Sequence, residues 1–77
     1  MTGHLLGGAG AIESVFSTLA VHHRIAPPTI NIENLDSQIS LDVVRDRPRP
    51  LEASRVIAIN DSFGFGGHNV VVAFASI

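Results

Sequence analysis

The C-terminal apolar run Val70–Ala75 constrains the fold of this chain more than any other feature. Every residue in the run is apolar, so both faces of a strand formed there would be hydrophobic. Strands of this kind occur where structure covers the sheet on both sides. The chain has 77 residues and one long amphipathic segment, at residues 5–21, which can supply only one of the two layers. We therefore expect the chain to be part of a larger body or the obligate partner of another chain.

A second apolar run, Val56–Ile59, is joined to the first by a glycine-rich segment at Ser62–Asn69. Both runs are short and rich in β-branched residues, which predicts two strands joined by a loop. Glycine in such a loop permits positive φ angles and lets the backbone approach a ligand closely. The loop also contains Phe63 and Phe65, and exposed aromatic rings are costly in water. The rings therefore either fold back into the core or form part of a site.

The first third of the chain predicts a helix. Four apolar residues follow the spacing of one helix face: Ile12, Val15, Phe16 and Leu19. This pattern predicts a helix over residues 5–21. The glycines at positions 7, 8 and 10 lie in its first turns, and each costs about 1 kcal/mol relative to alanine inside a helix. We expect close contact with another backbone to offset that cost.

Two polar residues near this helix are candidates for function. His4 stands just before the predicted helix, where an imidazole N–H can donate to a developing oxyanion. The plainer alternative is that His4 caps the helix or faces solvent. Glu13 lies among small and apolar neighbours, and its plainer alternative is an ordinary solvated carboxylate.

The middle of the chain predicts a meandering connection. Pro27–Pro28 end the helix and impose an extended path. Thr29–Ile32 and Leu41–Val44 are expected as short extended pieces, with a turn near residues 34–37. Charges and prolines alternate at Arg45–Pro50, which predicts a surface loop.

Composition excludes several classes of function. The net charge of −2 gives no indication of a nucleic-acid or anionic-membrane partner. The absence of cysteine excludes a disulfide framework, a cysteine-based zinc site and a thiol nucleophile within the chain. No apolar stretch approaches the roughly 20 residues that a membrane-spanning helix needs. We expect a cytoplasmic location, no membrane and no metal site.

Three segments carry a family resemblance. Residues 1–13, MTGHLLGGAGAIE, resemble the histidine segment of the β-ketoacyl-acyl-carrier-protein synthases, which are type II condensing enzymes. Residues 61–69, DSFGFGGHN, resemble the C-terminal glycine-rich loop of that family, and residues 26–31, APPTIN, resemble its proline segment. The resemblance covers essentially the whole chain, so residues 1–77 would be a partial C-terminal β-ketoacyl synthase domain.

The resemblance implies an α/β fold, namely the C-terminal part of a thiolase-like layered α/β/α/β/α arrangement. In that arrangement the chain would supply one buried helix, an extended connection and two core strands. It also implies decarboxylative Claisen condensation of an acyl thioester with malonyl-acyl-carrier protein in fatty acid biosynthesis. No dissociable cofactor is implied, because the substrates are carried on the phosphopantetheine of acyl carrier protein. The implied partners are acyl carrier protein, the remainder of the synthase and a second subunit in a homodimer.

The resemblance also assigns roles to individual residues. His4 falls on the family's second catalytic histidine, which hydrogen-bonds the malonyl thioester carbonyl as enolate charge develops. Phe65 falls on an aromatic gate between the acyl pocket and the malonyl site, and Phe63 on a neighbouring ring. Gly64 and Gly66 belong to the same loop, where a backbone amide would contribute to the oxyanion hole of the acyl thioester.

A structural role near the site is implied for three further residues. Glu13 would be a buried carboxylate close to Asn60 and Asp61. Asp61 stands where the family usually has asparagine, and His68 stands where threonine is commonest.

The chain lacks the cysteine nucleophile, the lysine and the first catalytic histidine of the family. We therefore expect it to have no condensing activity alone, because without a thiolate no acyl-enzyme forms. Two alternatives of other classes are a non-catalytic protein that docks onto a synthase and an unrelated small binding module. A polyketide ketosynthase or chain-length-factor fragment is a further alternative within the family.

Overall fold

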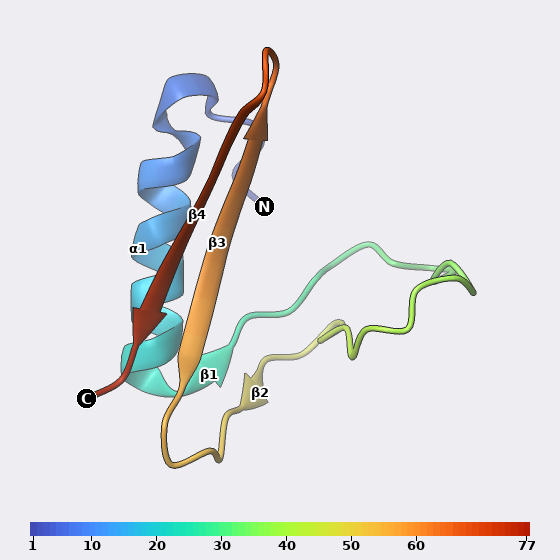
Figure 1. Ribbon diagram of the computed structural model, residues 1–77. Coiled ribbons are helices and arrows are strands. Elements are labelled where there is room, and N and C mark those ends of the chain that lie inside the picture. The colour runs from blue at the N-terminus through green and yellow to red at the C-terminus, as the bar shows by residue number, and fades with distance from the viewer.

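A computed structural model describes residues 1–77. Its elements follow the chain in the order η1, α1, β1, β2, β3, β4. A short 3-10 helix η1 (Leu6–Gly8) leads into the helix α1 (Ala9–His23), and two two-residue strands follow, β1 (Ile25–Ala26) and β2 (Arg49–Pro50). The long strands β3 (Ile57–Gly64) and β4 (His68–Ala75) form a hairpin that lies alongside α1 (Figure 1). The predicted α/β class is therefore confirmed.

The predicted helix is present as α1, but it begins later than the sequence predicts. The predicted start near residue 5 falls before η1, and α1 runs from Ala9 to His23. At its C-terminal end, Arg24 adopts a left-handed conformation with φ 54°, and its N–H donates to the carbonyls of Ala20 and Val21. A left-handed residue that returns its N–H to the last turn is a common way to end a helix.

The predicted apolar stripe of α1 does not face the hairpin. Val15 is 50% exposed, Phe16 44% and Leu19 46%. The most buried positions instead follow the opposite stripe, which consists of Gly10, Ser14, Ser17 and Val21. Small residues let a helix approach a sheet closely, and Gly10 meets this requirement: a Cβ built there would lie 4.0 Å from the Ser62 hydroxyl. The expected close contact therefore holds for Gly10, whereas Gly7 and Gly8 have no neighbour within 4 Å of such a Cβ.

The β3–β4 hairpin is longer, and its loop shorter, than predicted. The antiparallel ladder runs from the pair Ile57–Ala75 to the pair Gly64–His68. Most of the predicted loop at residues 62–69 is therefore strand, because backbone pairing continues irrespective of the polar side chains. Only residues 65–67 form the turn, in which Gly66 and Gly67 have φ 87° and 82°. Glycine is the residue that reaches such angles without steric cost.

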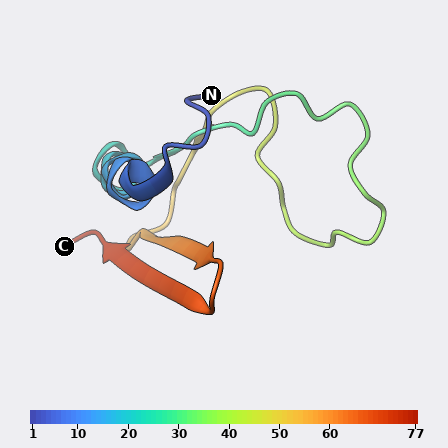
Figure 2. The same cartoon turned by 90° about the horizontal axis from the view of Figure 1, so that it is seen from above.

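The connection between α1 and β3 extends away from the rest of the molecule as a long loop (Figure 2). The predicted strand Thr29–Ile32 is reduced to one parallel bridge between Thr29 and Arg45, and Leu41–Val44 forms no strand. Within the predicted loop Arg45–Pro50, the last two residues pair with β1. The turn expected near residues 34–37 lies slightly later, at residues 36–39, where the Ile39 N–H donates to the Asp36 carbonyl over 3.0 Å.

The chain buries very little of itself. Val21 and Val56, which are 7% and 5% exposed, are its two buried residues. As the sequence predicts, the chain supplies only one covering layer, since α1 lies on one side of the hairpin and nothing in the chain covers the other. None of the helices has the length and apolar character needed to cross a bilayer.

Candidate functional site

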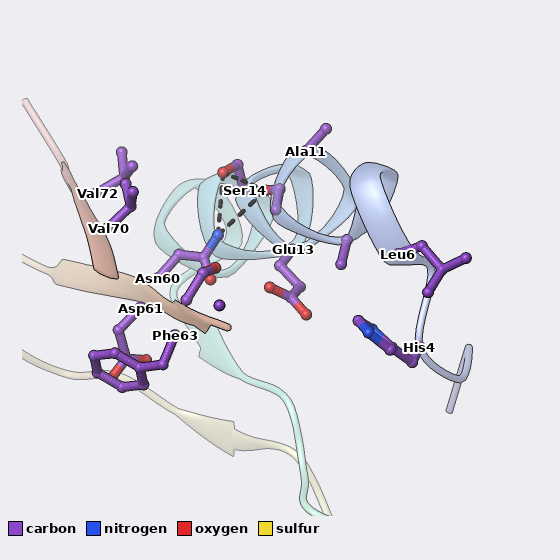
Figure 3. Close-up of a pocket in the computed structure, with 14 residues that line it drawn as sticks. His4, Leu6, Ala11, Glu13, Ser14, Asn60, Asp61, Phe63, Val70 and Val72 are labelled. Atoms are coloured by element: carbon purple, nitrogen blue, oxygen red, sulfur yellow. Dashed lines mark hydrogen bonds between the residues drawn. The ribbon is translucent and has the colours of Figure 1, made fainter. Parts of the chain in front are cut away.

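A pocket of about 660 Å³ lies between the N-terminal end of α1 and the β3–β4 hairpin. One wall comes from residues 4–14 and the other from residues 60–72. The two segments that resemble the family's histidine segment and its glycine-rich loop, residues 1–13 and 61–69, therefore meet at this pocket. Six of the residues singled out from the sequence line it: His4, Glu13, Asn60, Asp61, Phe63 and Gly64. Figure 3 shows the labelled members of this set around the pocket.

His4 lies on the helix wall of this pocket and is exposed. Its imidazole points toward the Glu13 carboxylate (Figure 3). The prediction that His4 stands directly before the helix is wrong, because η1 separates it from α1 and the N-cap of α1 is Gly8. The amide dipoles of α1 therefore do not point at the imidazole from an adjacent helix start. What His4 offers is a ring N–H at the edge of an open pocket.

Glu13 lies on α1 and lines the same pocket as Asn60 and Asp61, so these three residues are brought together. The burial implied for Glu13 is not found, because its side chain is exposed in this chain. The reason is that no second layer lies above this part of α1. Asp61 is likewise exposed and belongs to β3 rather than to a loop, with Val71 as its cross-strand partner.

Asn60 makes the side-chain hydrogen bonds that join the two walls. Its amide nitrogen Nδ2 donates to the Gly10 carbonyl and to the Ser14 Oγ, each over 3.2 Å. The Ser14 hydroxyl in turn donates to the Gly10 carbonyl over 2.7 Å. Sequence analysis did not identify Ser14 as part of the site. The available signal was the i, i+4 spacing of Gly10 and Ser14, which places two small residues on one helix face.

The two loop phenylalanines do not fold back into a core. Phe63 lines the pocket but remains 73% exposed, and Phe65 is fully exposed at 105%. Phe65 and Gly66 lie in the turn of the hairpin, outside the set of residues that line the pocket. Gly64 closes the strand ladder opposite His68.

The polar groups of the pocket include both donors and acceptors of hydrogen bonds. No group of three or more metal-ligating side chains forms in the chain. The imidazole of His4 and the amide of Asn60 are donors, and the carboxylates of Glu13 and Asp61 are acceptors.

Comparison with known proteins agrees with the resemblance. Residues 1–33 match the family described as "Beta-ketoacyl synthase, C-terminal domain". The chain is 53% identical over 72 residues to 3-oxoacyl-[acyl-carrier-protein] synthase 2 of Mycobacterium tuberculosis, across 94% of the chain. The chain is therefore similar, over nearly its whole length, to the C-terminal part of the β-ketoacyl synthases. His4 and Glu13 both lie within residues 1–33, the part of the chain that matches the family description.

Other β-ketoacyl synthases match over a similar extent. The chain is 51% identical over 74 residues to the 3-oxoacyl-[acyl-carrier-protein] synthase 2 of Synechocystis, across 96% of the chain. It is 48% identical over 80 aligned positions to the mitochondrial 3-oxoacyl-[acyl-carrier-protein] synthase of Arabidopsis thaliana, across 99% of the chain. The chain spans 17%, 17% and 16% of the length of these three relatives.

Proposed function

We propose that the chain forms the malonyl side of the active site of a 3-oxoacyl-acyl-carrier-protein synthase. The observation that carries this proposal is the pocket between α1 and the hairpin. It brings His4 together with Phe63 and Gly64, which lie about 60 positions further along the sequence. Two family-like segments that form one pocket are a stronger indication of a shared site than either segment alone.

In this proposal His4 stabilises the charge that develops during decarboxylation. The bond between the malonyl Cα and its carboxylate breaks, CO₂ leaves, and the electron pair enters an enolate with charge on the thioester oxygen. A ring N–H of His4 donates to that oxygen, where a positioned donor contributes most in the transition state. The enolate carbon then attacks the acyl thioester carbonyl, and the thiolate that carried the acyl group leaves.

The hairpin acts on the acyl side of the same reaction. The exposed ring of Phe65 at the tip of the hairpin is suited to act as a movable gate, because it packs against nothing in this chain. Phe63 forms a neighbouring wall, and the turn at Gly66 leaves the backbone open to a ligand. Glu13, Asn60 and Asp61 hold the shape of the site.

The remaining groups come from outside these residues. The nucleophilic cysteine, the lysine and the first catalytic histidine belong to the remainder of the synthase, with which the chain acts. The substrates are carried by acyl carrier protein, no separate cofactor is required, and the working enzyme is a cytoplasmic homodimer.

The proposal is tested by a fusion in which residues 1–77 replace the matching segment of the Mycobacterium tuberculosis relative. We expect the fusion to condense acyl and malonyl thioesters. We expect His4→Ala to lower the rate of malonyl decarboxylation by roughly 10²–10³-fold, as removal of one oxyanion donor does. Acyl loading of the cysteine should remain close to that of the unchanged fusion, measured by radiolabelled acyl transfer.

His22→Ala is the matched control, because His22 is an exposed imidazole at the far end of α1. It should leave both partial reactions unchanged. Equal loss of decarboxylation and acyl loading in His4→Ala would contradict the role of His4. An unchanged fusion that folds but does not condense would contradict the proposed function itself.

A further inference from the structure

We infer that Asn60 is a positioning residue that holds the helix wall and the hairpin wall of the pocket at their working separation. This inference rests on the proposed function, since it concerns the same pocket. The role of Asn60 does not require contact with the reacting atoms. Asn60 acts through Gly10 and Ser14, which belong to the helix that follows His4.

The amide of Asn60 is oriented by its two acceptors. A carbonyl oxygen such as that of Gly10 accepts but cannot donate, so only the NH₂ group of Asn60 can face it. The Ser14 hydroxyl donates its hydrogen to the same carbonyl and therefore accepts from Asn60. The three groups form a closed triangle in which each hydrogen bond supports the next (Figure 3). A triangle of this kind fixes one side-chain position rather than a range of positions.

Around the triangle, the β3 residues that face α1 are small, while β4 brings Val70, Val72 and Phe74 to the same side of the hairpin. A Cβ added at Gly10 would reach the Ser62 hydroxyl at 4.0 Å, and Asn60 and Ser62 alternate on the helix-facing side of β3. No other side-chain hydrogen bond joins α1 to the hairpin. Gly10 and Ser14 offer no large side chain that could interlock with β3. The directional bonds of Asn60 therefore set how β3 and the N-terminal part of α1 meet.

The triangle lies inside the pocket rather than behind it. Gly10, Ser14 and Asn60 all line the cavity, together with His4 on one wall and Phe63 on the other. A shift of the hairpin relative to α1 therefore changes the distance between the proposed enolate donor and the acyl side. Misplacement by about 1 Å lowers reaction rates by as much as roughly 10²-fold.

The test uses the fusion synthase described above, with Asn60→Asp as the main variant. This change keeps the size of the side chain but removes both donors and places a carboxylate against the Gly10 carbonyl. We expect decarboxylation to fall by roughly 10- to 100-fold, while acyl loading falls by less than about threefold. Both rates are measured well below the melting temperature, so that the protein is fully folded in each assay. A merely structural residue would lower the melting temperature and leave the ratio of the two rates unchanged.

Asn34→Asp is the matched control, because Asn34 is an exposed asparagine in the long connection and makes no side-chain hydrogen bond. It should change neither rate. Ser14→Ala and the double variant complete a cycle. We expect the double variant to lose less than the product of the two single losses, because both changes break the same triangle.

The outcomes separate the two proposals. The inference about Asn60 would be wrong if the rate losses of Asn60→Asp and Ser14→Ala multiplied in the double variant. It would also be wrong if Asn60→Asp lowered decarboxylation and acyl loading equally. If the unchanged fusion folds but does not condense, the proposed function fails. In that case the melting temperatures alone test the role of Asn60. The inference holds if the double variant loses less than the sum of the losses of Asn60→Asp and Ser14→Ala, and it fails if the two losses add.

Discussion

On the helix-facing side of the hairpin, Asn60 bonds to α1, and Ser62 lies against Gly10. On the opposite side, Ile57 is 61% exposed and Ile59 is 64% exposed. The register places Val71 on that same outer side, opposite Asp61. The β3 half of the helix-facing side is therefore in contact within these 77 residues, whereas Val70 and Val72 of β4 on the same side remain 57% and 40% exposed. The other face is uncovered and carries Ile57, Ile59 and Val71, with the charged Asp61 among them.

The difference shows how a layered fold distributes its interactions. The β3 residues that meet α1 are polar or small, because directional bonds and close approach set that geometry, and the β4 residues beside them are Val70, Val72 and Phe74. Large apolar residues lie where another layer would meet the sheet, because hydrophobic burial is non-directional and grows with the area covered. The helix repeats the pattern, since Phe16 and Leu19 face away from the hairpin.

The largest expected effect concerns cooperativity. We expect the isolated chain to unfold without a sharp transition, because two buried residues do not provide a core that offsets the entropy of ordering 77 residues. The fusion synthase should unfold cooperatively. Circular dichroism during thermal unfolding, combined with size-exclusion chromatography, distinguishes the two. A sharp transition from a monomeric isolated chain would remove the contrast between the two faces, because the exposed face would then need no cover.

The second prediction concerns the uncovered face itself. In the fusion synthase, Ile59→Asp should lower the free energy of unfolding by about 3–5 kcal/mol, as an unpaired charge does when it is buried. Ile59→Val is the conservative control and should cost about 0.5–1.5 kcal/mol. Urea titration followed by circular dichroism measures both values. Equal, small losses would mean that this face stays in contact with water in the full enzyme.

The smallest expected effect on stability lies at the tip of the hairpin. Phe65→Ala should change the free energy of unfolding of the fusion by no more than about 0.5 kcal/mol, because the ring lies on the turn, beyond the strand faces that another layer would cover, and a gating ring has to stay mobile. Acyl loading should change nonetheless, since the proposed role of the ring is to gate access. Loading rates for acyl chains of several lengths test this. Unchanged rates across all lengths, together with a large loss of stability, would make Phe65 a core residue rather than a gate.

Sequence patterns located the elements well but not their contacts. The i, i+3, i+4 spacing identified the helix, because periodicity reports which residues are apolar. It could not report which stripe would meet the hairpin, and the small-residue stripe through Gly10 and Ser14 does so instead. The loop predicted at residues 62–69 was longer than the observed turn at residues 65–67, again because contacts between segments are not visible in a local pattern. Backbone pairing through Ser62 and Asn69 depends on the partner strand, which a single run of residues does not show.

The sequence by itself determined the α/β class, the hairpin, the glycine turn and the two segments that carry the family resemblance. Each of these depends on the spacing of neighbouring residues or on a residue's own backbone preference, and both can be read directly from the sequence. Only the tertiary structure decided that Asn60 reaches across to Gly10 and that η1 separates His4 from α1. It also decided which faces remain uncovered. These features depend on distances between segments far apart in the chain, and such distances arise from packing rather than from any single pattern.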